Sequence, residues 1–165
     1  MPNWNENELT ITGDREQLQN FIKKAKGVNH EGKDTNLLLN NFVPLPEELK
    51  NTRSPSRNPK SARSQRLIKI YGCDNWWDWN IKNWGTKWDI DPDGLMFSLL
   101  KKKAIYDFDT AWSPPVKWLK KVSILFPKLT FKLKYEEPGI GFAGIATAKN
   151  GKFTDDCRNT LKGGE

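Results

Sequence analysis

The chain has 165 residues, of which 36% are apolar, and a formal net charge of +7. This length fits one domain with a single core. No run approaches the roughly 18 apolar residues of a membrane-spanning helix, so we expect no membrane partner. The first residues show neither a basic start nor an apolar segment, so we expect no secretory signal. Cys73 and Cys157 lie far apart, which favours reduced thiols in a cytoplasm over a disulfide or a metal site.

The positive charge is concentrated in one segment. Residues 50–66, KNTRSPSRNPKSARSQR, contain six basic side chains and no acidic one. Ser, Pro, Asn and Arg dominate without an apolar period, which predicts a flexible basic insertion within one domain. Such a segment either contacts the phosphates of a nucleic acid or serves as a plain soluble loop. The candidate phosphate contacts are Arg53, Arg57, Lys60, Arg63 and Arg66.

The first fifty residues predict a strand, a helix and a second strand. Apolar and polar residues alternate over residues 4–12, as in a half-buried strand. Asp14 is a candidate N-cap with Gln17 as its capping-box partner. An apolar stripe with helical spacing follows, formed by Leu18, Phe21, Ile22 and Ala25. The apolar run over residues 37–43 predicts a short strand that ends at Pro44.

The second half predicts two helices and four strands. Asp74 is expected to cap a helix over residues 75–84. Ser113-Pro114-Pro115 predicts the start of the other helix, because proline is favoured in the first turn. Apolar alternation and β-branched residues predict strands at residues 86–90, 105–112, 129–135 and 142–149. The polar sequence from Asn150 onward predicts a frayed end.

This order of elements predicts the fold class. It reads strand-helix-strand, basic insertion, then helix-strand-strand-helix-strand-strand. Antiparallel pairing with helices on one face gives an α+β fold, and we expect a ferredoxin-like antiparallel sheet with added elements. In this interpretation residues 1–154 form one domain, residues 50–66 are its flexible insertion, and residues 155–165 are a polar C-terminal tail.

Five of the eight tryptophans lie in residues 74–88, DNWWDWNIKNWGTKW. Periodicity assigns five tryptophans to the core: Trp77, Trp84, Trp88, Trp112 and Trp118. Trp76 and Trp79 fall on another side of the predicted helix, beside Asn80 and Asn83, so we predict that both rings face outward. There they would stack on bases, at about 1–3 kcal/mol per base, or form a hot spot for a partner protein. The remaining alternative is that the insertion covers them.

Residues suited to catalysis are sparse. His30, the only histidine, lies in a polar loop. Four acids fall on neighbouring predicted strands and could serve acid–base or metal chemistry, although charges on a wet sheet face are the commoner arrangement: Asp107, Asp109, Glu136 and Glu137. Gly139, Gly141 and Gly144 spell G-x-G-x-x-G, but no helix follows. They therefore predict a glycine-rich hairpin connection and not a dinucleotide site.

Three stretches together resemble one known family: NWGTKWDI (residues 83–90), FDTAWSPPVKWL (residues 108–119) and YEEPGIGFAGIA (residues 135–146). With the opening MPNW, they are similar to the YubB-like, ferredoxin-like domain family carried by bacteriophages and plasmids. The resemblance covers most of the chain outside residues 50–66 and the C-terminal tail. It implies a small cytoplasmic accessory protein of a mobile element. The family name describes topology only, because an iron–sulfur cluster normally needs four thiolates and the chain has two cysteines.

Three functional hypotheses follow. The first is a non-enzymatic binding protein of a phage or plasmid, in the cytoplasm of the bacterial host. It would hold a nucleic acid or a small nucleotide, and could sequester it against host defence, through Trp76, Trp79, Asn80, Asn83 and the basic residues of 50–66. The second is an inhibitor that binds a host protein through the same aromatic patch. The third is a carboxylate-dependent hydrolase or nuclease that uses Asp109. We assign no catalytic residue, metal ligand or cofactor, and the oligomeric state stays open.

Overall fold

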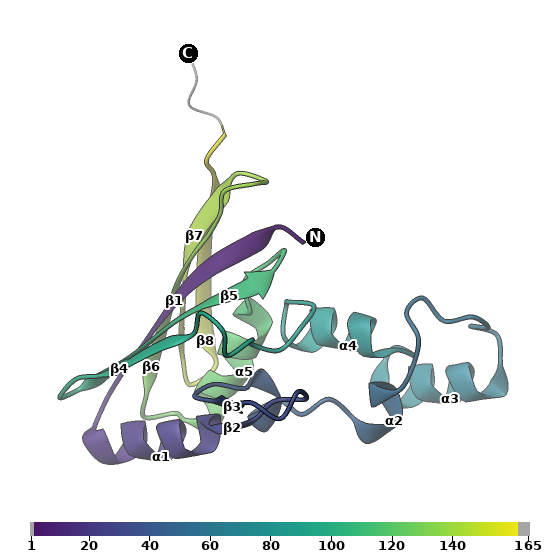
Figure 1. The fold of residues 1–165 in the computed structure, drawn as a ribbon, viewed down its shortest axis with the longest axis horizontal. Coiled ribbons are helices and arrows are strands. Elements are labelled where there is room, and N and C mark those ends of the chain that lie inside the picture. Colours follow the sequence, from purple (N-terminus) through teal and green to yellow (C-terminus); the bar gives the residue numbers. More distant parts are fainter. Residues whose placement is uncertain (1, 162–165) are drawn as a thin grey trace.

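The computed structural model describes residues 2–161, and its centre is a six-stranded antiparallel sheet (Figure 1). The strands lie in the order β4-β5-β1-β6-β7-β8. Their bounds are Trp4–Thr12 (β1), Met96–Leu99 (β4), Lys103–Ala111 (β5), Thr130–Glu137 (β6), Phe142–Lys149 (β7) and Lys152–Asn159 (β8). Helices α1 (Arg15–Ala25) and α5 (Val116–Leu125) cover one face of this sheet, and the other face carries no helix.

The topology confirms the predicted α+β, ferredoxin-like fold. The chain passes through β1-α1-β4-β5-α5-β6, and the four strands of this unit are neighbours in the order β4-β5-β1-β6. The hairpin-connected strands β7 and β8 then extend the sheet beyond β6. None of the helices in residues 2–161 is long and apolar enough to cross a membrane.

The core lies between the sheet and the two helices. Leu9 and Ile11 of β1 are fully buried, whereas Glu6 and Glu8 on the same strand face the helix-free side, as strand alternation requires. The predicted helical stripe of α1 is confirmed, since Leu18, Phe21, Ile22 and Ala25 are all buried. Phe21 stacks on Phe42 with ring centroids 4.7 Å apart. The Asp14 capping box is not formed, because Asp14 makes no side-chain cap hydrogen bond.

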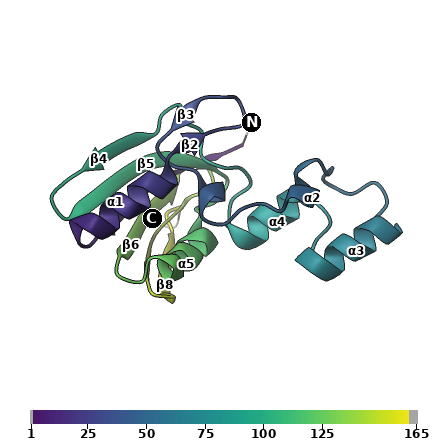
Figure 2. The same ribbon diagram turned by 90° about the horizontal axis from the view of Figure 1, so that it is seen from below.

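A long insertion separates α1 from β4, and its helices project away from the sheet (Figure 2). It contains β2 (Gly27–Val28), β3 (Asp34–Thr35), the 3₁₀ helix η1 (Leu39–Asn41), α2 (Glu47–Lys50), α3 (Ala62–Tyr71) and α4 (Trp76–Asn83). The prediction of a segment without regular structure over residues 50–66 is wrong for residues 62–66, which belong to α3. Ser61 caps this helix by accepting a hydrogen bond from the Ser64 N–H at 3.1 Å.

Two predicted strands are absent, and four strands were not predicted: β2, β3, β4 and β8. Residues 37–43 contain the 3₁₀ helix, and residues 86–90 are irregular, because the Asp89 carboxylate accepts hydrogen bonds from backbone N–H groups of both segments. The predicted polar tail is wrong for residues 155–159, and its last residues, 162–165, lie outside the described residues. Residues 152–159 form β8, which pairs with β7 from Lys152 opposite Lys149 to Asn159 opposite Phe142. The folded domain therefore extends beyond the predicted boundary at residue 154.

Candidate functional site

The structure reverses the predicted orientation of several tryptophans. Trp79 is only 7% exposed, whereas Trp77, Trp88 and Trp112, all expected in the core, are each about 40% exposed or more. On α4 the side that carries Trp79 and Asn80 is buried, and Trp79 packs edge-on against Trp84 at 5.9 Å. Of the residues expected to face the core from this helix, Trp77 and Ile81 are exposed, whereas Trp84 is buried as predicted, and so is Trp118 of α5. The prediction of two outward rings is therefore wrong for Trp79, while Trp76 is half-buried.

A cavity of about 780 Å³ lies where the insertion meets the ends of β1 and β5. Four indole rings line it, and we call it the Trp cavity: Trp4, Trp76, Trp84 and Trp88. Trp4 comes from the start of β1, Trp76 from the start of α4, and the other two from the segment that follows α4. The sheet and the insertion thus build the Trp cavity together.

The rings of the Trp cavity are held in place by specific contacts. The Trp84 indole N–H donates to the Val43 carbonyl at 2.8 Å. Trp88 lies 6.5 Å from Trp4, centroid to centroid, at an interplanar angle of 44°. The Lys87 ammonium lies 4.3 Å from the centre of the Trp88 ring, a cation–π distance. These contacts fix aromatic surfaces before any ligand arrives.

Asn80 supplies a buried polar group to the lining of the Trp cavity. It lines the cavity, is 4% exposed, and donates from Nδ2 to the Lys87 carbonyl at 2.8 Å. Its other side-chain atom, Oδ1, is buried without a hydrogen-bond partner within the described residues. A flipped amide would place two acceptors, Oδ1 and the Lys87 carbonyl oxygen, against each other. The orientation in which Nδ2 donates to that carbonyl is therefore the favourable one. A buried acceptor without a partner costs about 1–3 kcal/mol, which a donor on a ligand would recover.

Asp89 forms a rigid part of the wall. Its Oδ1 accepts from the N–H groups of Leu39 at 2.7 Å and Ile90 at 2.8 Å, and its Oδ2 accepts from Asn40 at 3.0 Å. Burial raises the pKa of the Asp89 carboxyl, and the three N–H donors oppose that rise. Because its acceptor sites are already engaged by backbone, Asp89 positions the wall and does not offer a free charge.

The charges around the Trp cavity are unevenly distributed. Glu31, Asp91 and Asp109 lie on its lining, and the cations there are Lys50 and, when protonated, His30. Lys50 ends α2 and is also the first residue of the basic segment 50–66. An anionic group is therefore favoured only on the side of the cavity where Lys50 lies, and there it would compete with Glu47, which pairs with Lys50 at 2.6 Å.

Of the nine site residues predicted from sequence, only Trp76 and Asn80 line the Trp cavity. Asn83 instead donates from Nδ2 to the Trp79 carbonyl at 2.9 Å and accepts from Lys121. The basic residues are exposed on the projecting insertion, where Arg66 pairs with Glu48 at 3.0 Å. Arg53, Arg57, Lys60 and Arg63 make no ion pair with any described residue. Sequence reasoning missed Trp4 and Trp88, although both stand in the motifs that carry the family resemblance.

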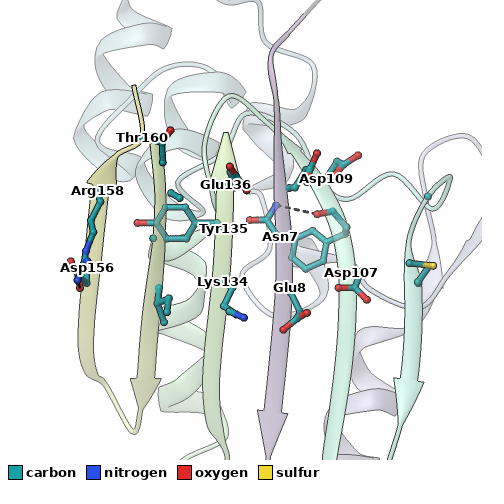
Figure 3. Close-up of a pocket in the computed structure, with 17 residues that line it drawn as sticks. Asn7, Glu8, Asp107, Asp109, Lys134, Tyr135, Glu136, Asp156, Arg158 and Thr160 are labelled. Atoms are coloured by element: carbon teal, nitrogen blue, oxygen red, sulfur yellow. Dashed lines mark hydrogen bonds and ion pairs between the residues drawn. The ribbon is translucent and has the colours of Figure 1, made fainter. Parts of the chain in front are cut away.

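The predicted carboxylates do not form one cluster. Asp107, Asp109 and Glu136 lie on the helix-free face of the sheet, where a second, open concavity measures about 930 Å³ (Figure 3). Glu137 is buried on the opposite side and accepts hydrogen bonds from the N–H groups of Gly139, at 2.9 Å, and Ile140. No group of three or more His, Cys, Asp and Glu side chains in residues 2–161 has the arrangement of a metal site.

The glycine-rich segment is a hairpin connection, as predicted. Gly139 and Gly141 lie in the turn between β6 and β7, and Gly144 lies within β7. Gly141 has a φ of +87°, a conformation that favours glycine. No helix follows, so the segment lacks the geometry of a dinucleotide site.

Comparisons with known proteins agree with this fold. Residues 83–162 match the model of the ferredoxin-like domain in Api92-like proteins. The crystal structure of the protein api92 from Yersinia pseudotuberculosis is similar over the full length of both chains, with a TM-score of 0.58 at 12% sequence identity, a likeness that shows the fold alone. No curated protein matches the sequence. The matched region contains Trp84 and Trp88, whereas Trp4 and Trp76 lie outside it.

Proposed function

We propose that the protein is a non-enzymatic binding protein for a nucleotide, free or within a nucleic acid strand. The base would occupy the Trp cavity, and the phosphates would lie towards Lys50 and the basic segment 50–66. The observation that carries this proposal is a cavity that is lined by four indole rings and by Asn80, a residue with an unpartnered Oδ1, and whose wall includes Lys50, the start of the basic segment.

The Trp cavity suits a flat heteroaromatic group with an N–H donor. Base–aromatic stacking contributes about 1–3 kcal/mol per base. Every nucleobase has an amino group or a ring N–H that can donate to Asn80 Oδ1. The acidic residues on the lining disfavour a phosphate inside, so the phosphate belongs outside, beside Lys50.

The basic segment supplies the second half of the proposal. Arg53, Arg57, Lys60 and Arg63 are exposed and free of ion pairs with described residues, so they can meet phosphates without breaking an internal contact. Phosphate contacts of this kind release counterions, so binding should weaken steeply with salt.

We place this binding protein in a mobile element, in the cytoplasm of a bacterial host. The motifs at residues 83–90, 108–119 and 135–146 support that assignment through their resemblance to the YubB-like family of phages and plasmids. Sequestration of a nucleotide against host defence would be a use for such a protein.

The test is a titration of intrinsic tryptophan fluorescence with nucleosides, nucleotides and short single strands across a salt series. We expect quenching by nucleosides that depends little on salt, and tighter, salt-sensitive binding of strands. Trp76→Ala should remove both. Arg57→Ala/Arg63→Ala should weaken the binding of strands and lower its salt dependence but leave nucleoside quenching unchanged, and Trp112→Phe, outside the cavity, should change neither. Absence of binding to every compound in the set would refute the proposal.

A second candidate is a protein that binds a host protein. Trp77 and Ile81 lie one helical turn apart on α4 and are each more than a third exposed, as are Ile68 and Ile70 of α3. Exposed aromatic and apolar side chains of this kind are enriched in protein interfaces. A partner retained by Trp76→Ala but lost with Trp77→Ala/Ile81→Ala would favour this function over nucleotide binding.

A further inference from the structure

One end of the helix-free face of the sheet, which we call the acidic sheet face, is strongly acidic (Figure 3), whereas Lys103, Lys132, Lys149 and Lys152 lie towards the other end of the same face. Its open concavity of about 930 Å³ is lined by six acids, Glu6, Glu8, Asp107, Asp109, Glu136 and Asp156, and by two cations, Lys134 and Arg158. Arg158 already pairs with Asp156 at 3.0 Å. The other five acids make no ion pair with the described part of the chain.

The strand register places these acids side by side. Glu6 lies opposite Asp109 on one neighbouring strand and opposite Glu136 on the other. Glu8 lies opposite Asp107, and burial together with the Glu8 charge raises the pKa of the Asp107 carboxyl. Like charges directly opposite one another destabilise a sheet. The face thus carries a concentrated negative field that a cationic partner would relieve.

The chain also carries a cationic surface, whose charge is complementary to that of the acidic sheet face. On α3, Arg63, Arg66 and Lys69 fall within an arc of about 120°, as the helical repeat of 100° per residue requires. Arg57 and Lys60 precede the helix. We call residues 53–69 the basic arm. It projects away from the sheet in both views, so its own copy's acidic face is not its neighbour (Figures 1 and 2).

We propose that the acidic sheet face binds the basic arm of a second copy of this chain. Charge complementarity favours the basic arm of a second copy as the partner. Five acids without ion pairs face outward at one end of the molecule, and arginines and lysines without ion pairs lie at the other end. Exposed apolar side chains match as well: Met96 and Ile145 on the face, and Ile68 on the basic arm. The contact is heterologous, so each copy uses a different surface from its partner, and copies join head to tail or close into a ring.

The test is the mass of the protein in solution, measured by light scattering on a size-exclusion column. At about 10 mM salt, where charges interact over roughly 30 Å, we expect association that rises with protein concentration. At about 1 M salt, where this range is roughly 3 Å, we expect monomers. A wild-type protein that is monomeric at low salt at every concentration would overturn the proposal.

Two variants separate the two surfaces. The face variant is Glu6→Gln/Glu8→Gln/Glu136→Gln, and the arm variant is Arg57→Glu/Arg63→Glu. Each variant alone should be monomeric at low salt. An equal mixture should restore a one-to-one complex, because the arm of the face variant meets the intact face of the arm variant.

The controls exclude general charge effects and misfolding. Lys23→Glu/Lys128→Glu makes the same charge change as the arm variant at exposed lysines of α1 and of the loop between α5 and β6, and should associate like the wild type. The face variant removes repulsion, so it should unfold no earlier than the wild type. A mixture that stays monomeric, or single variants that associate normally, would contradict the proposal. Neither outcome bears on nucleotide binding in the Trp cavity.

Discussion

Tyr135 of β6 donates a hydrogen bond from its hydroxyl to the Asp155 carboxylate of β8, at 2.5 Å, across the intervening strand β7. The ring passes over Gly144, where a Cβ would lie 2.3 Å from the hydroxyl oxygen. This contact ties the outermost strand to the core of the sheet. It explains why a glycine stands at residue 144, and it adds to the pairing with β7 that holds β8 in the sheet.

Tyr135→Phe should lower the free energy of unfolding by about 1–2 kcal/mol, because a hydrogen bond to a charged acceptor is lost. Burial, and next the bond to Asp155, raise the pKa of Tyr135 above its ordinary value of 10.0. The folded state therefore favours the neutral hydroxyl, and its stabilising contribution is complete below about pH 10 and is lost at higher pH. Urea unfolding from pH 7 to pH 11 should show the wild-type advantage shrinking. A difference that does not change with pH would contradict this assignment, and Tyr71→Phe, at an exposed hydroxyl, should cost little.

Gly144→Ala should destabilise the sheet by about 1–3 kcal/mol, as expected for an overpacked site. The added Cβ would lie 2.3 Å from the Tyr135 hydroxyl oxygen and 2.8 Å from the Asp156 carbonyl oxygen. In a Tyr135→Ala background the ring is gone, so the cost of Gly144→Ala should be smaller. Equal costs in the two backgrounds, measured by denaturant unfolding, would show that the ring is not the constraint.

Asn80→Ala should weaken nucleoside binding about fivefold, which corresponds to a net hydrogen bond of about 1 kcal/mol. Asn83→Ala is the matched control, since Asn83 stands on the same helix, binds the Trp79 carbonyl and does not line the Trp cavity. Calorimetric titration of both variants measures the difference. Equal losses in the two variants would mean that Asn80 acts through the stability of α4 and not through its free Oδ1.

Glu6→Gln should raise the free energy of unfolding by about 0.5–1 kcal/mol at pH 7, because two opposed carboxylates, Asp109 and Glu136, lose a like-charged neighbour. Below about pH 3, where carboxylates are mostly protonated, the gain should disappear. Glu8→Gln is the contrasting variant, since Glu8 lies between Asp107 and Lys134 and loses both a repulsion and an attraction. If both substitutions change stability equally in thermal unfolding, register-specific repulsion is excluded.

The periodicity of apolar residues predicted those helices and strands that pack one face on the core and expose the other. β1, α1, β6 and β7 follow their apolar patterns closely, because burial of one face determines both the pattern and the structure. β8 carries no such pattern: nearly all its residues are exposed, and pairing with β7 holds it. Local sequence holds little information about such a strand.

The candidate site was predicted only in part, for reasons of tertiary structure. The periodicity of α4 gives two apolar sides, and only the packing against its surroundings decides which one is buried; here it is the side of Trp79 and Asn80. Residues 86–90, which include Trp88, alternate in polarity as a strand does. Hydrogen bonds from backbone N–H groups to the Asp89 carboxylate hold this segment in an irregular conformation instead. Trp4 lies far from the other rings in sequence and joins them only through the fold.

The most direct test of the account is a nuclear magnetic resonance titration that follows the indole N–H signals of the tryptophans as a nucleotide is added. We predict that the signals of Trp4, Trp76, Trp84 and Trp88 shift together along one saturable binding curve. Those of the buried Trp118 and the exposed Trp112 should stay in place. Shifts absent from the four cavity rings, or spread equally over all eight indoles, would contradict binding in the Trp cavity.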